Sequence, residues 1–185
     1  MCGIVGYVGK KQCTDILIGA LSKLEYRGYD SAGIAVFENN KIKVEKCQGR
    51  LKTLAEKPDD GKAVYGTCGI GHTRWATHGE PSDINSHPHG NKRVSIVHNG
   101  IIENYMKIKE FLIDQGYGFE SETDTEAVAK LLDYYYDGDP VDTIIKVLAE
   151  IEGSYALGIM FRDFPDRIFA VRKDSPLIIG LSDEE

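Results

Sequence analysis

Apolar positions in seven short stretches either alternate with polar ones or form brief apolar runs, and both patterns predict β-strands. Asn39 and Asn40 separate two of these stretches by two residues, which favours a hairpin turn. The last three stretches lie too close together for helical crossovers, which favours antiparallel pairing. The predicted strands are residues 3–8, 31–38, 41–48, 93–100, 154–161, 167–173 and 176–180.

Four other stretches carry apolar residues three and four positions apart, the spacing of one helix face. Gly28 and Gly116 follow two of them as plausible helix ends, and Thr123 with Glu126 fits a capping box before a third. Together with the strands, these helices predict a layered α+β domain with two helix pairs. The apolar positions are Leu17, Ala20, Leu21 and Leu24; Tyr105, Ile108 and Leu112; Val128, Leu131, Leu132 and Tyr135; and Val141, Ile144, Ile145 and Leu148.

Residues 74–92 have no usable periodicity and interrupt this pattern. They contain the only tryptophan, three of the five histidines and two prolines. A loop this long inside a single domain is often a lid or a binding loop. A surface excursion is the alternative, and Trp75 argues against it because a large apolar ring usually covers something.

Composition narrows the class of protein. The chain has 185 residues, 42% hydrophobic, and a formal charge of −7, which predicts one domain with a substantial core. The absence of a basic face argues against a nucleic-acid partner. Because we find neither a membrane-length apolar run nor a secretory signal, we expect a cytoplasmic protein without a membrane partner. We expect Cys13, Cys47 and Cys68 to be reduced and buried.

Cys2 directly follows the initiator methionine. An N-terminal cysteine carries a thiol and, once Met1 is removed, a free amine that can accept the thiol proton. The alternative is an ordinary buried cysteine near a strand start, and Cys2 alone favours this simpler reading.

His98, Asn99 and Gly100 form an "HNG" sequence at a strand end. The Asn99 amide and the Gly100 N–H could stabilise the oxyanion formed when a thiol attacks an amide. Asn-Gly is equally typical of a plain turn.

A free amino acid as substrate needs one cationic and one anionic partner. Arg74 could bind its carboxylate and Asp124 its ammonium group. Asp124 fits equally well as an acid that complements a helix dipole. Arg27 competes with Arg74 for the carboxylate, or supports the site through Asp30.

Histidines raise two further possibilities. His87 and His89 suggest part of a metal site, but a third ligand at convincing spacing is missing, so we expect no metal and no cofactor. Pairing of Cys2 with His72, His78 or His98, as in papain-like enzymes, stays open because such pairs meet only in the fold.

Six motifs, in order and over essentially the whole chain, carry a family resemblance. They are "MCGIVGY", "YRGYDSAGIA", "GHTRWATHG", "HNGIIENY", "SETDTE" and "EGSYAL". Together they resemble the glutaminase domain of class II glutamine amidotransferases. Within this family, "YRGYDSAG" and "HTRWATHG" most resemble the branch that transfers ammonia to fructose 6-phosphate in hexosamine biosynthesis. The phosphoribosylamine-forming branch is the alternative.

The resemblance implies an N-terminal-nucleophile hydrolase fold, a four-layer αββα sandwich with two mainly antiparallel sheets. It implies removal of Met1, with Cys2 as nucleophile and its amine as base. Asn99 and Gly100 would form the oxyanion hole. L-Glutamine would be the substrate, with Arg74 binding its carboxylate and Asp124 its ammonium group.

The resemblance also implies supporting roles around the site. Thr77 and His78 would line it, Trp75 would gate ammonia passage, and Arg27 would support the nucleophile. Residues 74–80 would close over glutamine. Residues 1–185 would form the glutaminase domain alone, without the sugar-isomerase-type domains that bind fructose 6-phosphate, and the full-length enzyme would be a homo-oligomer.

Overall fold

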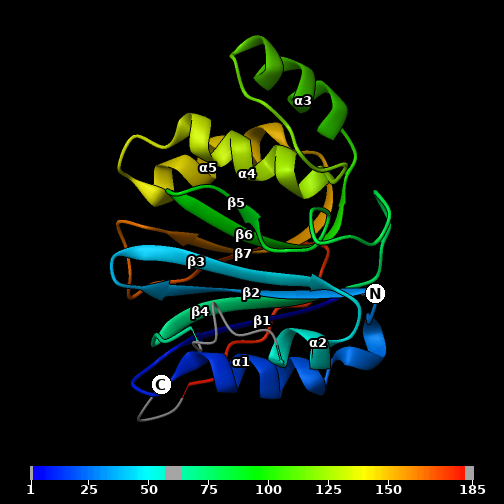
Figure 1. Ribbon diagram of the computed structural model, residues 1–185. Helices are drawn as coiled ribbons and strands as arrows, with labels where there is room; N and C mark the ends of the chain where they lie inside the picture. The colour runs from blue at the N-terminus through cyan, green and yellow to red at the C-terminus, as the bar shows by residue number, and fades with distance from the viewer. Residues whose placement is uncertain (1, 57–63, 182–185) are drawn as a thin grey trace.

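Two four-stranded antiparallel sheets lie face to face in the computed structural model, which describes residues 2–56 and 64–181 (Figure 1). The first sheet has the order β1-β4-β2-β3 and the second β5-β6-β7-β8. Every strand pair in both sheets is antiparallel, as the short connections predict. The strands are β1 (Gly3–Val8), β2 (Ser31–Glu38), β3 (Lys41–Gln48), β4 (Cys68–Arg74), β5 (His89–Gly90), β6 (Val94–Ile102), β7 (Gly153–Phe161) and β8 (Phe169–Lys173).

Helices cover the outer face of each sheet. The first sheet carries α1 (Cys13–Ser22) and α2 (Leu51–Ala55), and the second carries α4 (Asp124–Tyr135) and α5 (Pro140–Glu150). Helix α3 (Tyr105–Asp114) packs farther out beside α4, and a 3₁₀ turn, η1 (Glu25–Arg27), follows α1. This arrangement confirms the predicted αββα sandwich. Among the described residues, no helix is long and apolar enough to cross a membrane.

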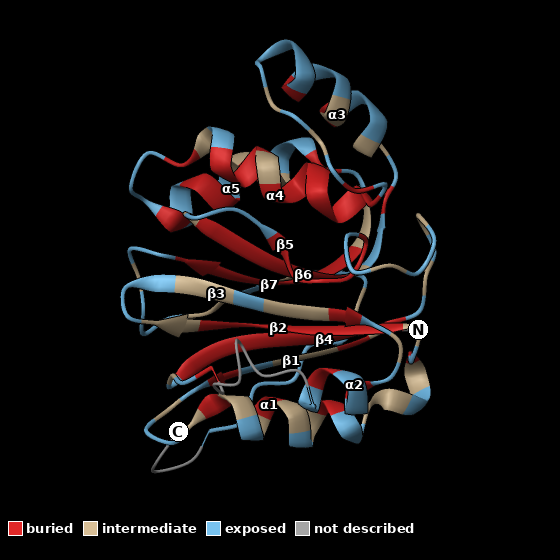
Figure 2. Cartoon of the chain, viewed as in Figure 1, coloured by how far each residue is buried: buried red, intermediate tan, exposed pale blue. Residues whose placement is uncertain are grey.

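Three buried clusters correspond to the three interfaces between layers (Figure 2). Between the sheets, Ile70 and Val97 are fully buried together with Met160. The other two clusters lie between each sheet and its helices. All four cysteines are free, and Cys13, Cys47 and Cys68 are buried, as predicted.

The β2–β3 hairpin matches its predicted register, since Glu38 pairs with Lys41 across the turn. Asn39 and Asn40 have φ values of 50° and 60°, the left-handed conformation that a two-residue turn requires. The prediction of a strand at residues 176–180 is wrong. In the structure these residues pair with no strand of either sheet, and Leu177, Ile178 and Ile179 are exposed.

Helix boundaries follow their capping residues. Thr123 caps α4 by accepting a hydrogen bond from the Glu126 N–H, as predicted. The reciprocal half of the capping box is absent, because the Glu126 carboxylate accepts from the N–H groups of Glu120 and Ser121 instead. The first predicted helix ends at Ser22, two residues before the last expected apolar position.

Helix α5 begins at Pro140, and proline favours the first position of a helix. The Asp139 side chain caps the helix by accepting hydrogen bonds from the N–H groups of Val141 and Asp142. Of its four predicted apolar positions, Ile144 is buried and Leu148 is partly buried, whereas Val141 and Ile145 are exposed.

Candidate active site

Cys2 lies just before β1, at the edge where β1 pairs with the end of β4. The backbone N–H of Trp75 donates to Cys2 Sγ at 3.2 Å, and Sγ lies 3.6 Å from the Trp75 carbonyl oxygen. Burial raises the pKa of the Cys2 thiol, and the hydrogen bond from Trp75 only partly opposes this. The thiol is therefore protonated at neutral pH and needs a base before it can act as a nucleophile.

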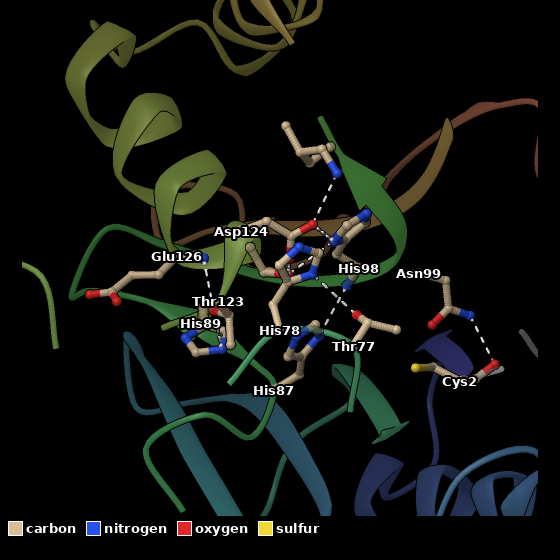
Figure 3. Close-up of polar contacts among 12 residues, drawn as sticks. Cys2, Thr77, His78, His87, His89, His98, Asn99, Thr123, Asp124 and Glu126 are labelled. Carbon is tan, nitrogen blue, oxygen red and sulfur yellow. Dashed lines mark hydrogen bonds and ion pairs between the residues drawn. The ribbon is translucent and has the colours of Figure 1, made fainter. Parts of the chain in front are cut away.

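Asn99 brings the second sheet to this cysteine. It lies on β6, and its side-chain Nδ2 donates to the Cys2 carbonyl oxygen at 3.0 Å (Figure 3). Gly100 follows with φ of 127°, and a Cβ at this position would collide with the Ser154 carbonyl oxygen on β7. Only glycine fits this backbone, so "HNG" is part of a strand rather than a plain turn, with an amide donor facing Cys2.

Arg74, the last residue of β4, is only 3% exposed. Its Nη2 donates to the carbonyl oxygens of His78 and Gly79, at 3.0 Å for Gly79. Its Nη1 is buried and has no hydrogen-bond partner among the described residues. Burial lowers the pKa of Arg74, and Asp30 opposes this. A buried guanidinium nitrogen without an acceptor is suited to bind a ligand carboxylate.

Asp124 is the first residue of α4 and is 5% exposed. Its Oδ2 accepts from the Ile102 N–H at 2.9 Å and lies 3.8 Å from His98 Nδ1 (Figure 3). The carboxylate therefore lies in the first turn of the helix, as expected for an acid that complements the helix dipole. It also accepts a hydrogen bond from β6, the strand that carries Asn99. Its negative charge lies close enough to Arg74 to act on that guanidinium.

The histidines do not form a papain-like pair with Cys2. His78 Nδ1 contacts Thr77 Oγ1 at 3.3 Å, and His98 Nδ1 contacts Thr125 Oγ1 at 2.9 Å. His72 is buried, which lowers its pKa to about 3. Among the hydrogen bonds of the described residues, none joins a histidine nitrogen to the Cys2 sulfur. The papain-like interpretation therefore lacks its base.

Residues 75–80 of the irregular segment lie around the site. Asp30 accepts from the Ala76 N–H through Oδ2 and from Ser31 Oγ at 2.9 Å through Oδ1. Arg27 donates to the Tyr26 hydroxyl at 3.1 Å. Among the described residues no hydrogen bond joins it to Asp30, through which we expected Arg27 to support the site. Trp75 is 47% exposed, with its ring edge-to-face on Tyr29.

The rest of the irregular segment is anchored to the body of the protein. Asn85 Nδ2 donates to the Glu80 carbonyl oxygen at 2.9 Å and to Glu122 Oε2 at 3.1 Å. Lys46 Nζ donates to the carbonyl oxygens of Ile84 and Ser86, both at 3.1 Å. These bonds hold the segment from Glu80 to Ser86 against the body of the protein.

His87 and His89 are buried and serve the packing of the loop. His87 Nδ1 accepts from the His98 N–H at 3.4 Å, and His89 Nε2 lies 3.1 Å from Thr123 Oγ1. In the described part of the chain, no group of three or more His, Cys, Asp or Glu side chains could hold a metal ion.

The structure thus brings together six of the predicted site residues, Cys2, Arg74, Trp75, Asn99, Gly100 and Asp124, while Thr77 and His78 lie on the adjoining loop. The sequence did not predict that Asn85 anchors the loop. It suggested His72 only as a possible base and not as a partner of Asn99. Neither residue has a local signal, because their partners are 37 and 27 positions away. Met1, whose removal we predicted, lies outside the described residues.

Comparison with known proteins agrees with this geometry. The family model "Glutamine amidotransferase domain" matches residues 72–184. The glutamine–fructose-6-phosphate aminotransferases of Clostridium acetobutylicum and Thermus thermophilus are 58% and 50% identical to this chain over its whole length. The chain spans only 30% and 31% of those relatives.

Two solved structures have a fold similar to that of this chain. The glutamine phosphoribosylpyrophosphate amidotransferase of B. subtilis is similar to 88% of this chain, with a TM-score of 0.74 and 28% identity, over 35% of its own length. A structure described as the allosteric regulatory enzyme of purine biosynthesis matches at a TM-score of 0.77 and 29% identity, over 88% of this chain and 36% of its own. With the matched family model covering more than half of its residues, the chain belongs to the glutamine amidotransferase domain family.

Proposed function

We propose that this chain hydrolyses the side-chain amide of L-glutamine to glutamate and ammonia through a thioester on Cys2. The observation that carries the proposal is the convergence of Cys2 with Asn99, whose side-chain amide on the opposite sheet donates to the Cys2 carbonyl oxygen at 3.0 Å. A nucleophile and an oxyanion donor in register are the minimum for amide cleavage by a thiol.

In the proposed reaction, the Cys2 sulfur attacks the side-chain carbonyl carbon of glutamine. Asn99 Nδ2 and the Gly100 N–H stabilise the tetrahedral oxyanion. The C–N bond breaks as the Cys2 amine, which took the thiol proton, protonates the leaving ammonia. Water, deprotonated by the same amine, then cleaves the γ-glutamyl thioester and releases glutamate.

The base in this scheme is the Cys2 α-amine. Removal of Met1 is required, since the Cys2 nitrogen is otherwise an amide that cannot accept a proton. A thiol with an ordinary pKa of about 8.5 is mostly protonated at neutral pH, so the reaction needs a base. The lack of a histidine on the sulfur among the described residues favours the amine over an imidazole.

Substrate binding uses the two buried charges beside the nucleophile. The unpartnered Nη1 of Arg74 would bind the α-carboxylate of glutamine, and Asp124 its α-ammonium group. Residues 75–80 would close over the bound amino acid, since Arg74 holds the carbonyl oxygens of His78 and Gly79. Thr77 and His78 would line the closed site.

For the ammonia acceptor we propose fructose 6-phosphate, bound by parts of a longer, homo-oligomeric protein, with Trp75 gating the ammonia. Relatives named for this reaction are 47–59% identical to the chain. The phosphoribosylpyrophosphate amidotransferase, the alternative, is 28% identical, so the first acceptor is favoured.

The test assays glutamate release by the protein and by its Cys2→Ala variant, after confirming by urea unfolding that the variant is folded. We expect glutaminase activity that the variant loses completely. Full activity in Cys2→Ala would refute the nucleophile assignment.

A further inference from the structure

The orientation of the Asn99 amide is set by contacts at both of its ends. Asn99 Nδ2 lies 3.0 Å from the Cys2 carbonyl oxygen, and Asn99 Oδ1 lies 3.1 Å from His72 Nε2. Because an asparagine amide can be turned by 180°, some group must decide which end faces Cys2.

Two backbone carbonyl oxygens, those of His98 and Cys2, determine the orientation of the Asn99 amide because each can only accept a hydrogen bond. His72 Nε2 also lies 3.0 Å from the His98 carbonyl oxygen, which can only accept, so Nε2 carries the proton. That N–H is shared between two acceptors, so the Asn99 atom facing it is Oδ1. At the other end, the Cys2 carbonyl can only accept, which requires the donor Nδ2.

We propose that His72 is a positioning residue for catalysis, whose Nε2–H holds the Asn99 amide with its donor towards Cys2. The inference rests on the proposed glutaminase function and adds a role for a residue that does not touch the thiol. If the amide turned over, Oδ1 would face the Cys2 carbonyl oxygen and the developing oxyanion, neither of which can donate a hydrogen bond to it, and the oxyanion hole would lose its side-chain donor.

The surroundings of His72 fix the position of its ring and keep the proton on Nε2. The ring is fully buried, and it stacks on His87 with ring centroids 4.1 Å apart and planes 26° apart. Its Nδ1 has no hydrogen-bond partner among the described residues, so no competing acceptor draws the proton away from Nε2. With a pKa of about 3, the ring stays neutral over the working range of an enzyme.

The experiment compares three substitutions in the full natural polypeptide that carries this sequence. His72→Met removes the donor at similar length, His72→Gln keeps an N–H at the Nε2 position, and His72→Asn places it at the Nδ1 position. We expect His72→Met to lower kcat by about ten- to a hundredfold with KM nearly unchanged. His72→Gln should restore most of kcat and His72→Asn should not.

A double-mutant cycle separates positioning from mere packing. In an Asn99→Ala background, His72→Met should cause no further loss of kcat, because there is no amide left to orient. An equal loss in both backgrounds, or a loss confined to KM, would overturn the proposal. If His72→Met does not fold, equal kcat values for His72→Gln and His72→Asn would overturn it instead.

The same experiment distinguishes this inference from the proposed function. Absence of glutaminase activity in the unsubstituted, folded protein lacking Met1 would refute both. An active protein with an unchanged kcat in folded His72→Met would refute only the role of His72.

Discussion

Arg74 Nη2 donates to the Gly79 carbonyl oxygen at 3.0 Å, while the other terminal nitrogen of the same guanidinium has no partner among the described residues. One side chain thus fastens the loop over the site and presents a free donor to it. In the proposed function, this arrangement would couple binding of the substrate carboxylate to the loop that covers it.

Replacing Arg74 should remove recognition of the substrate carboxylate. A charge-assisted hydrogen bond contributes about 1.5–3 kcal/mol, or roughly ten- to a hundredfold in kcat/KM. The test compares glutamine with 4-aminobutanamide, which lacks the α-carboxylate, in the unsubstituted protein and in Arg74→Met. We expect the variant to lose most of its preference for glutamine. An unchanged preference would show that the carboxylate is bound elsewhere.

Replacing Asn99 should affect the chemical step more than binding. Loss of an oxyanion donor costs about 2.7–4 kcal/mol of barrier, so Asn99→Ala should lower kcat by about 10²–10³-fold with little change in KM. Asn104→Ala is the matched control, because the Asn104 side chain bonds the backbone of Glu150 and Glu152 rather than that of Cys2. The control should lose stability but keep kcat. Steady-state kinetics that show equal kcat losses in both variants would contradict the assignment.

Gly33 on β2 lies where the irregular segment meets the first sheet, and a Cβ there would collide with the His87 carbonyl oxygen. Gly33→Ala should therefore destabilise the protein by at least about 1–3 kcal/mol. Gly19→Ala is the control, because that exposed position in α1 has open space around it. It should stabilise the helix by up to about 1 kcal/mol. Urea unfolding of both variants checks the pair, and a neutral Gly33→Ala would be inconsistent with this packing.

Buried histidines should make the protein sensitive to acid. Burial lowers the pKa of His72 to about 3, against about 6.5 in an unfolded chain. The unfolded state therefore binds the extra proton between these values. The stability from this group is complete above about pH 6.5 and is lost as the pH falls towards 3. His87, His89 and His98 shift in the same direction, mainly through burial.

Removing one of these histidines should reduce that sensitivity by one proton. In His72→Gln, the slope of unfolding free energy against pH below pH 6 should fall by about 1.4 kcal/mol per pH unit. Denaturant titrations from pH 7 to pH 4.5 measure it for both proteins. Identical slopes would mean that His72 titrates normally in the folded state.

Local patterns were sufficient to predict most of the fold. The hairpin at Asn39 and Asn40 and the Thr123 cap were predicted because their determinants are neighbours in sequence. The expected strand at residues 176–180 failed because an apolar run specifies a strand only where a partner strand is available.

Candidate site residues were predicted from chemistry and family motifs, but the contacts that orient them were not. The Asn99–His72 contact and the Asn85–Glu122 anchor join positions 27 and 37 apart, and neither leaves a periodic signal. Geometry also argues against a histidine base: the Cys2 sulfur contacts the Trp75 backbone, and no hydrogen bond among the described residues joins it to a histidine nitrogen.

The most direct test of the account is the dependence of activity on Met1. Two preparations, one with Met1 removed and one with Met1 retained by inhibiting methionine aminopeptidase during expression, are characterised by intact mass and assayed for glutaminase activity. The account predicts that the specific activity follows the fraction of chains that begin at Cys2, and that a γ-glutamyl adduct forms only on those chains. Full activity in the preparation that retains Met1 would contradict the central claim that the Cys2 amine is the base.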